Sequence, residues 1–237
     1  MVGFILFDPL YLVMLAPAML LALWAQVKVK SAFARAQEVP AGGGLTGAEA
    51  AARILRVHGL ARVGVEPAQG FLSDHYDPRA KVLRLSPEVF NGRSLAAVGV
   101  AAHEAGHAIQ DAAGYGPLKL RNGIVPMAAV GSNLSFIMFI VGMALSATAL
   151  GRGLVLVGIG LFSLTVVFQL VNLPVEFDAS RRARAVLVAN GIVGPQQDAE
   201  VGRVLNAAAM TYVAATISAI LTLLYLLLRS GLLGRRS

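Results

Sequence analysis

Apolar residues along the chain are gathered in four long runs that contain no charged residue and no histidine. The runs cover residues 10–27, 124–150, 154–175 and 207–228 and contain 18, 27, 22 and 22 residues. A helix needs about 17–25 apolar residues to cross a bilayer, and a chain this short has too little polar sequence to bury four such helices. The pattern therefore predicts four membrane-spanning helices, with Gly151 and Gly153 forming a tight turn between the second and third.

The polar positions lie mainly in two segments, residues 28–123 and 176–206, which four crossings place on the same side of the membrane. Nine basic residues lie near the membrane ends on that side: Lys28, Lys30, Arg35, Lys119, Arg121, Arg181, Arg182, Arg184 and Arg203. Four lie on the other side: Arg152, Arg229, Arg235 and Arg236. Because basic residues favour the cytoplasmic side, we expect both polar segments to be cytoplasmic.

The first polar segment has the pattern of a small α+β domain. Thr46 and Glu49 form a capping box that begins a helix ending near His58. Short strands are predicted at 63–65 and 81–85, with a turn at 73–79 between them. The second strand would suit a sheet edge that pairs with an extended substrate. A longer helix follows from about Ser94 to Ala113.

Composition narrows the class of protein. Hydrophobic residues make up 57 % of the chain and charged residues 14 %, with a mean hydropathy of +0.69, whereas soluble domains are about a quarter charged. The net charge of +7 is spread along membrane flanks rather than in one dense run, so we expect no nucleic-acid partner. The absence of cysteine excludes disulfides, thiolate nucleophiles and cysteine-bound metals.

The strongest chemical signal lies in the helix predicted from about Ser94 to Ala113, which contains the sequence His103-Glu104-Ala105-Gly106-His107. Side chains four residues apart share a helix face, so both imidazoles can bind one Zn²⁺ ion. Glu104 lies beside them, where it can take a proton from water held by the metal. Gly106 fits closely packed surroundings.

A catalytic zinc site needs a third protein ligand. The extended motif with a third histidine is absent, because Gln110 occupies its glycine position and Ala113 its histidine position. The acids just after the third apolar run, Glu176 and Asp178, lie on the same membrane face as the histidines. Either of them could complete the site.

The residues around these positions carry a family resemblance. Residues 101–110 and 173–180 resemble the YugP-type family of neutral zinc metallopeptidases of bacterial membranes, as do 74–78 and 207–215. The resemblance covers nearly the whole chain. It implies a zincin-like catalytic domain in a mainly α membrane protein of the bacterial inner (cytoplasmic) membrane.

A more distant similarity to HtpX-type membrane proteases concerns the third ligand. Those proteins place two membrane helices between the histidine motif and a glutamate ligand, which maps onto Glu176. Phe177 and Ala179 match their pattern, but Ser180 stands where they have aspartate. Ser180 or Asp178 could therefore orient a zinc-bound histidine.

These residues predict a zinc-dependent endopeptidase in which Glu104 activates water. Its chain divides into an N-terminal anchor (1–27), a catalytic segment (28–123), a membrane hairpin (124–175), a third-ligand helix and loop (176–206) and a C-terminal membrane helix with a basic tail (207–237). The candidates for stabilising the transition state are Arg181, Arg182, His75 and Tyr76.

The expected partners are a peptide or protein substrate and the lipid bilayer, with room for a homo-oligomer or a further membrane partner. Two other functions stay open. One is a zinc-binding scaffold without turnover. The other is a metal or solute transporter, although the histidines lie outside the apolar runs.

Overall fold

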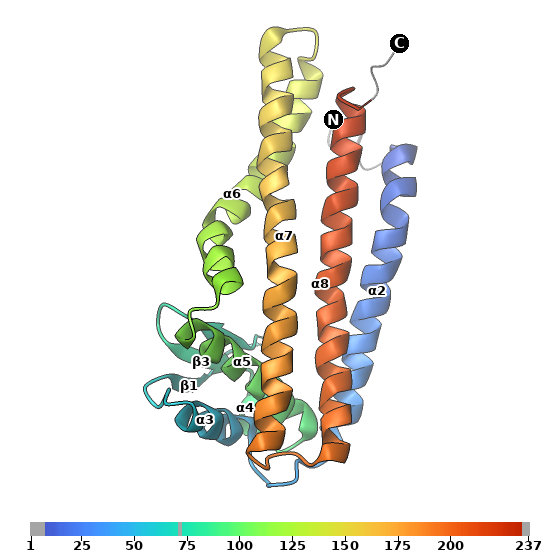
Figure 1. The fold of residues 1–237 in the computed structure, drawn as a ribbon. Coiled ribbons are helices and arrows are strands. Elements are labelled where there is room, and N and C mark those ends of the chain that lie inside the picture. Colours follow the sequence, from blue (N-terminus) through green and yellow to red (C-terminus); the bar gives the residue numbers. More distant parts are fainter. Residues whose placement is uncertain (1–7, 71–72, 234–237) are drawn as a thin grey trace. The chain divides into compact units, whose positions relative to one another are not determined.

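The computed structural model describes residues 8–70 and 73–233, and most of these are helical (Figure 1). The elements are α2 (Pro9–Gln37), α3 (Gly47–Val57), β1 (Gly64–Pro67), β2 (His75–Asp77), β3 (Val82–Leu85), α4 (Pro87–Asn91), α5 (Leu95–Ala112), α6 (Gly116–Ala144), α7 (Ala149–Ala189) and α8 (Pro195–Arg229). They form two compact units. Among the described residues, unit 1 comprises 8–24, 120–173 and 211–233, and unit 2 comprises 25–70, 73–119 and 174–210.

Unit 1 is built from the apolar parts of four helices. Among the described residues, the helices α2, α6, α7 and α8 are each long and apolar enough to cross a membrane, in agreement with the four predicted spans. Their shared core includes Phe139, Phe162 and Tyr225. Many apolar side chains face outward, among them Val13 and Val130, as expected for a surface that contacts lipid rather than water.

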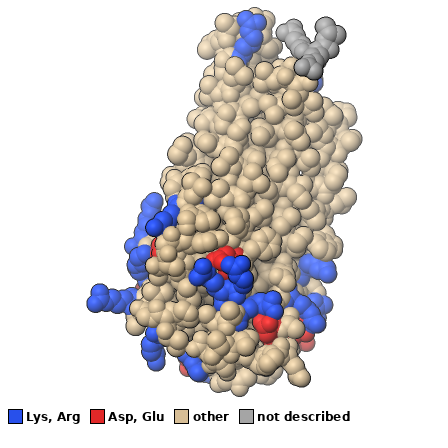
Figure 2. Space-filling model, in the orientation of Figure 1, with Lys and Arg blue, Asp and Glu red and all other residues tan. Residues whose placement is uncertain are grey.

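Charged side chains are rare in unit 1 and gather in unit 2. In the described part of unit 1 they are Asp8, Arg121, Arg152 and Arg229. Asp8 accepts a hydrogen bond from Tyr225 and pairs with Arg229 at 3.0 Å. In Figure 2 the upper half of the surface is almost entirely tan, and most blue and red side chains gather in the lower half among tan ones. The predicted topology also used Arg235 and Arg236, which lie outside the described residues.

The turn between the second and third spans differs from the prediction. The structure places it at residues 145–148, and Gly151 and Gly153 lie within the first two turns of α7. The reason is Thr148, whose hydroxyl accepts a hydrogen bond from the Gly151 backbone N–H at 3.0 Å and so begins the helix there. Gly151 instead allows a close approach, because a Cβ atom there would lie 2.0 Å from the Leu145 carbonyl oxygen.

Unit 2 contains a three-stranded sheet in the order β1-β3-β2, with β1 parallel and β2 antiparallel to β3. The prediction that residues 81–85 form an edge strand is wrong, because β3 is the central strand. The predicted turn at 73–79 is also partly wrong, since its middle forms β2. Three residues are too few to show a strand's alternation, whereas β3 shows it, with Leu83 and Leu85 buried.

The helices of unit 2 pack into one core with the sheet. The predicted capping box is confirmed: Thr46 accepts from the Glu49 N–H and Glu49 accepts from the Thr46 N–H, and α3 ends at a His58 cap. The core joins α3 and β3 to α5 and to the parts of α7 and α8 that belong to this unit. Its buried members include Ile54, Leu95, Leu187, Ile192 and Val201. The predicted fold class, four apolar helices with a small α+β part, is confirmed.

Candidate metal centre

The helix α5 presents both histidines of the motif on one face. Its first turn is capped by Ser94, whose side chain accepts a hydrogen bond from the Ala97 N–H at 3.2 Å. Alanines occupy most of the positions of α5 that pack into the core. The polar side chains of His103 and His107 therefore have small residues as neighbours on the helix. Their ring centroids lie 4.8 Å apart, which is the neighbour spacing that the i, i+4 pattern predicts.

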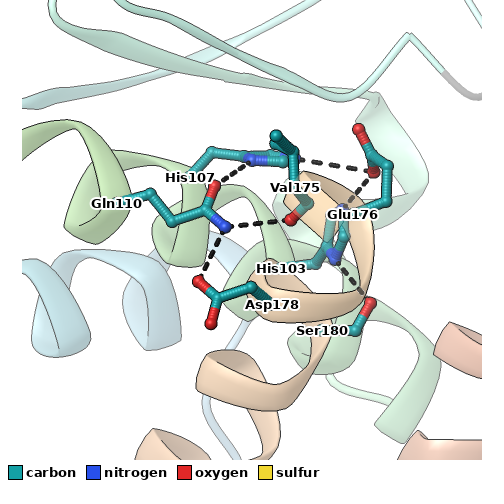
Figure 3. A network of polar contacts seen from close by, with 7 residues as sticks. All are labelled: His103, His107, Gln110, Val175, Glu176, Asp178 and Ser180. Atoms are coloured by element: carbon teal, nitrogen blue, oxygen red, sulfur yellow. Dashed lines mark hydrogen bonds and ion pairs between the residues drawn. The ribbon is translucent and has the colours of Figure 1, made fainter. Parts of the chain in front are cut away.

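The helix α7 brings Glu176 to these rings (Figure 3). Its Oε2 atom lies 3.3 Å from His103 Nε2 and 3.7 Å from His107 Nε2. Gly106 allows this approach, because a Cβ atom there would lie 2.7 Å from the Ala179 carbonyl oxygen of α7. The close packing expected at Gly106 is therefore observed, and the missing side chain lets the two helices meet at the site.

The spacing of the three side chains fits a zinc ion. One ligand atom from each of His103, His107 and Glu176 lies within 4.8 Å of the others. In a tetrahedral site with bonds of about 2.0–2.1 Å, neighbouring ligand atoms lie about 3.3–3.4 Å apart. The two nitrogen–oxygen distances are close to this value. Two imidazoles and one carboxylate are also the donor set that catalytic zinc uses in a class of peptidases.

Glu104 lies next to this group and is 7 % exposed. Burial raises the pKa of its carboxyl group to about 7, and the negative charges of Glu176 and Asp74 act in the same direction. His103 and a hydrogen bond from the Tyr76 backbone N–H oppose this rise in the pKa. A carboxyl group with a pKa near neutrality can both accept and return a proton.

Each histidine has a second hydrogen-bond partner at its Nδ1 atom. His103 Nδ1 lies 3.1 Å from the Ser180 hydroxyl oxygen, and His107 Nδ1 lies 3.0 Å from Gln110 Oε1. The sequence suggested Ser180 for this position but not Gln110. The signal available was its spacing, since Gln110 follows His107 by three residues and so lies one turn along the same helix face.

Asp178, the other candidate for the third ligand, has different partners. It is 3 % exposed and accepts hydrogen bonds from Gln110 at 2.9 Å and from Arg182 Nε at 2.5 Å. Arg181 pairs with its other oxygen. The structure thus brings Glu176 to the histidines and places Asp178 one layer further out. Both arginines point to Asp178, and Arg182 also stacks 5.8 Å from the Tyr115 ring.

The two candidates in β2 are also engaged elsewhere. The exposed His75 ring contacts the Ser73 carbonyl oxygen through Nδ1 at 2.8 Å. The Tyr76 hydroxyl donates to Asp111 at 2.7 Å, and burial together with this bond raises the pKa of Tyr76. The strand β2 contacts the site through the Tyr76 backbone N–H, which donates a hydrogen bond to Glu104.

A carboxylate that sequence reasoning missed supports the loop before β2. Asp74 accepts hydrogen bonds from the Ser86 backbone N–H at 2.8 Å and from its hydroxyl at 3.1 Å. Burial raises the pKa of Asp74. Asp74 belongs to the stretch 74–78 that carries the family resemblance, but this contact could not be predicted locally, because its partner lies 12 positions further along the chain.

Comparison with known proteins agrees with this centre. A family model described as "Putative neutral zinc metallopeptidase" matches residues 11–231. The chain is 46 % identical over 215 residues to "Putative membrane protease YugP" of Bacillus subtilis (strain 168), covering 91 % of this chain and 94 % of that protein. No solved structure matches. The chain is thus an integral membrane protein that belongs to the family of putative neutral zinc metallopeptidases.

Proposed function

We propose that this protein is a membrane-bound zinc endopeptidase in which His103, His107 and Glu176 hold the metal and Glu104 is the general base. The observation that carries the proposal is the convergence of the three ligand atoms within 4.8 Å, beside a buried carboxyl group. The similarity to a protein named as a membrane protease supports the peptidase assignment.

The reaction is hydrolysis of a peptide bond by water. A bound zinc ion would polarise the peptide carbonyl group and make water easier to deprotonate. The Glu104 carboxylate takes the proton from the attacking water and holds it while the tetrahedral carbon forms. It then gives the proton to the leaving amine as the carbon–nitrogen bond breaks.

The buried position of Glu104 suits this role. A bound metal ion would add positive charge that favours the ionised carboxylate, whereas burial and the neighbouring charges of Glu176 and Asp74 raise the pKa of Glu104 to about 7. A carboxyl group with a pKa near neutrality is suited to take a proton from water and to return it to the leaving amine at neutral pH. The Tyr76 backbone N–H holds the carboxylate in place.

The active site faces the cytoplasm of a bacterial cell in this proposal. Unit 2 contains the second polar segment and the first as far as Lys119. Nine basic residues near the membrane ends lie on the side of these segments and four on the other, an excess that is typical of the cytoplasmic side. The substrates are then peptides or proteins that reach the cytoplasmic face of the inner membrane.

A transporter is less well supported, because His103 and His107 lie on α5, which is not one of the four apolar helices. A zinc-binding scaffold differs from a peptidase only in turnover. Replacing Glu104 with Gln separates these two functions, because the variant keeps the metal ligands and loses the base.

The test measures zinc content and cleavage of an unfolded protein substrate by the purified chain in detergent. Glu104→Gln should retain zinc and lose cleavage by at least about 100-fold. Glu38→Gln, which changes an exposed residue beyond α2, is the matched control and should behave as wild type. Unchanged cleavage by Glu104→Gln would exclude the assigned base, and a wild-type chain with zinc but no cleavage would favour the scaffold.

A further inference from the structure

The side-chain amide of Gln110 lies between the two helices that form the metal centre. Gln110 has no exposed surface, and its amide contacts three groups (Figure 3). The nitrogen Nε2 lies 2.9 Å from the Val175 carbonyl oxygen and 2.9 Å from Asp178 Oδ2. The oxygen Oε1 lies 3.0 Å from His107 Nδ1.

The chemistry of these partners fixes which way the amide points. The Val175 carbonyl oxygen can only accept hydrogen bonds, and so can the Asp178 carboxylate, which is ionised beside Arg181 and Arg182. The NH₂ group of Gln110 must therefore face these two oxygens. Its own oxygen then faces His107 and accepts, so the Nδ1 atom of His107 carries the proton.

This proton position determines what His107 offers at its other nitrogen. A neutral imidazole carries one N–H, so Nε2 presents a lone pair toward Glu176 Oε2, which lies 3.7 Å away. In this form the Nε2 lone pair and the Glu176 carboxylate oxygen can bind one cation placed between them. His103 is different, because the Ser180 hydroxyl at its Nδ1 can donate or accept and so does not choose the nitrogen that carries the proton.

The same amide also holds the turn of α7 that carries Glu176. Val175 precedes Glu176 directly, and Asp178 follows it by two residues, so the two bonds from Gln110 Nε2 lie on either side of the third ligand. One buried side chain on α5 thereby sets the proton of one ligand and restrains the backbone beside another.

From these contacts we propose that Gln110 is a positioning residue for metal binding. It keeps His107 in the form that binds zinc through Nε2, and it fixes the Glu176 turn against α5. This inference rests on the proposed zinc site and concerns metal affinity rather than turnover. Partners of zinc-bound histidines in other proteins change metal affinity by about 10–100-fold when removed.

The first test replaces Gln110 with Met, which has similar length but no hydrogen bonds. Zinc affinity is measured by competition with a chelator, below the temperature at which the metal-free variant unfolds. We expect Gln110→Met to bind zinc about 10–100-fold more weakly than wild type. Gln196→Met, at an exposed position in α8, is the matched control and should bind zinc like wild type.

A purely structural role predicts a different result. The metal-free Gln110→Met variant would then unfold at a lower temperature, yet the folded protein would bind zinc as tightly as wild type. That result would overturn the inference and leave the proposed peptidase function intact. A wild-type chain that does not bind zinc would instead overturn the proposed function.

A second variant keeps the test decisive if the Met variant does not fold. Gln110→Glu retains an oxygen that accepts from His107 Nδ1 but cannot, when ionised, donate to Val175 or Asp178. We expect its zinc affinity to lie below wild type, with a changed visible spectrum after Co²⁺ is substituted for zinc. A wild-type affinity together with an unchanged Co²⁺ spectrum would overturn the inference.

Discussion

The two helices that form the metal centre reach it by different means. On α5, His103, Glu104 and His107 lie on neighbouring positions of one helix, and the helix geometry alone brings the two rings to 4.8 Å. On α7, Glu176 lies 73 positions from His103, and only contacts between the helices bring it there. The α5 ligands should therefore resist changes elsewhere, whereas the α7 ligand should depend on those contacts.

The largest effect should follow from removing the α7 ligand itself. Zinc binding in folded protein sites is worth about 10–16 kcal/mol, so one of four ligands contributes about 3 kcal/mol, or at least about 100-fold in affinity. Glu176→Ala should lose this much zinc affinity in a chelator competition assay.

The matched variant is Asp178→Ala, which removes a carboxylate from the same turn. It leaves Gln110, Arg181 and Arg182 without a shared partner, and zinc affinity should fall by only about 10-fold. If Asp178→Ala lost more zinc affinity than Glu176→Ala, the third ligand would be Asp178 rather than Glu176.

The next effect should come from separating the helices without touching a ligand. In Gly106→Ala the new methyl group would lie 2.7 Å from the Ala179 carbonyl oxygen, and the overpacking should cost about 1–3 kcal/mol of unfolding free energy. Zinc affinity should fall by at least about 10-fold, because Glu176 moves with α7.

Gly116→Ala provides the control for helix propensity, since a Cβ atom at Gly116 meets nothing within 4 Å. This variant should keep wild-type zinc affinity and stability or gain slightly in stability. Wild-type zinc binding by Gly106→Ala would show that Glu176 does not depend on this contact.

A smaller effect is expected at the second partner of His103. Ser180→Ala removes one hydroxyl group, and His103 is partly accessible to water, with 15 % of its side chain exposed. The loss of one neutral hydrogen bond is worth about 0.5–1.5 kcal/mol, so zinc affinity should fall by about 10-fold or less. If Ser180→Ala lost more zinc affinity than Gln110→Met, the Ser180 hydroxyl would matter more for zinc binding than the Gln110 amide, contrary to this prediction.

The smallest effect on zinc affinity should come from a change in the sheet, at Asp77 of β2. Arg84 and two backbone N–H groups lower the pKa of Asp77 to about 2, from an ordinary value of 3.8. Because the folded-state pKa is the lower one, this bond stabilises the protein above about pH 4 and is lost as the pH falls toward 2.

Thermal unfolding of the metal-free protein tests this sign. Wild type should unfold at a higher temperature than Asp77→Asn at pH 6, and the gap should shrink as the pH approaches 2. Zinc affinity at neutral pH should be the same in both proteins. A gap that grows on acidification would mean that Asp77 is not held ionised by Arg84.

The parts that the sequence predicted correctly are those with a local physical cause. The apolar runs, the Thr46–Glu49 capping box and the His103–His107 spacing each depend on neighbouring residues, and the structure has all three features. The position after an apolar run narrowed the third metal ligand to two acids, Glu176 and Asp178. The resemblance to the HtpX-type proteases then favoured Glu176.

The parts that were missed depend on contacts between distant residues. The spacing of Gln110 from His107 is a local signal, but its bonds to Val175 and Asp178 join residues 65 and 68 positions apart and have no local cause. The strand β2 is too short to have a pattern of its own and exists through pairing with β3. The position of the α6–α7 turn depends on the hydroxyl of Thr148 rather than on the glycines that follow it.

The central claim is that two histidines and one carboxylate of this chain hold a zinc ion. X-ray absorption at the zinc edge, on untagged protein loaded with one equivalent of zinc, tests it directly. The wild-type spectrum should show two imidazole nitrogens at about 2.0–2.1 Å with oxygen in the remaining positions, and the His107→Ala spectrum should show one imidazole fewer. A wild-type spectrum with fewer than two imidazoles, or one that His107→Ala leaves unchanged, would contradict it.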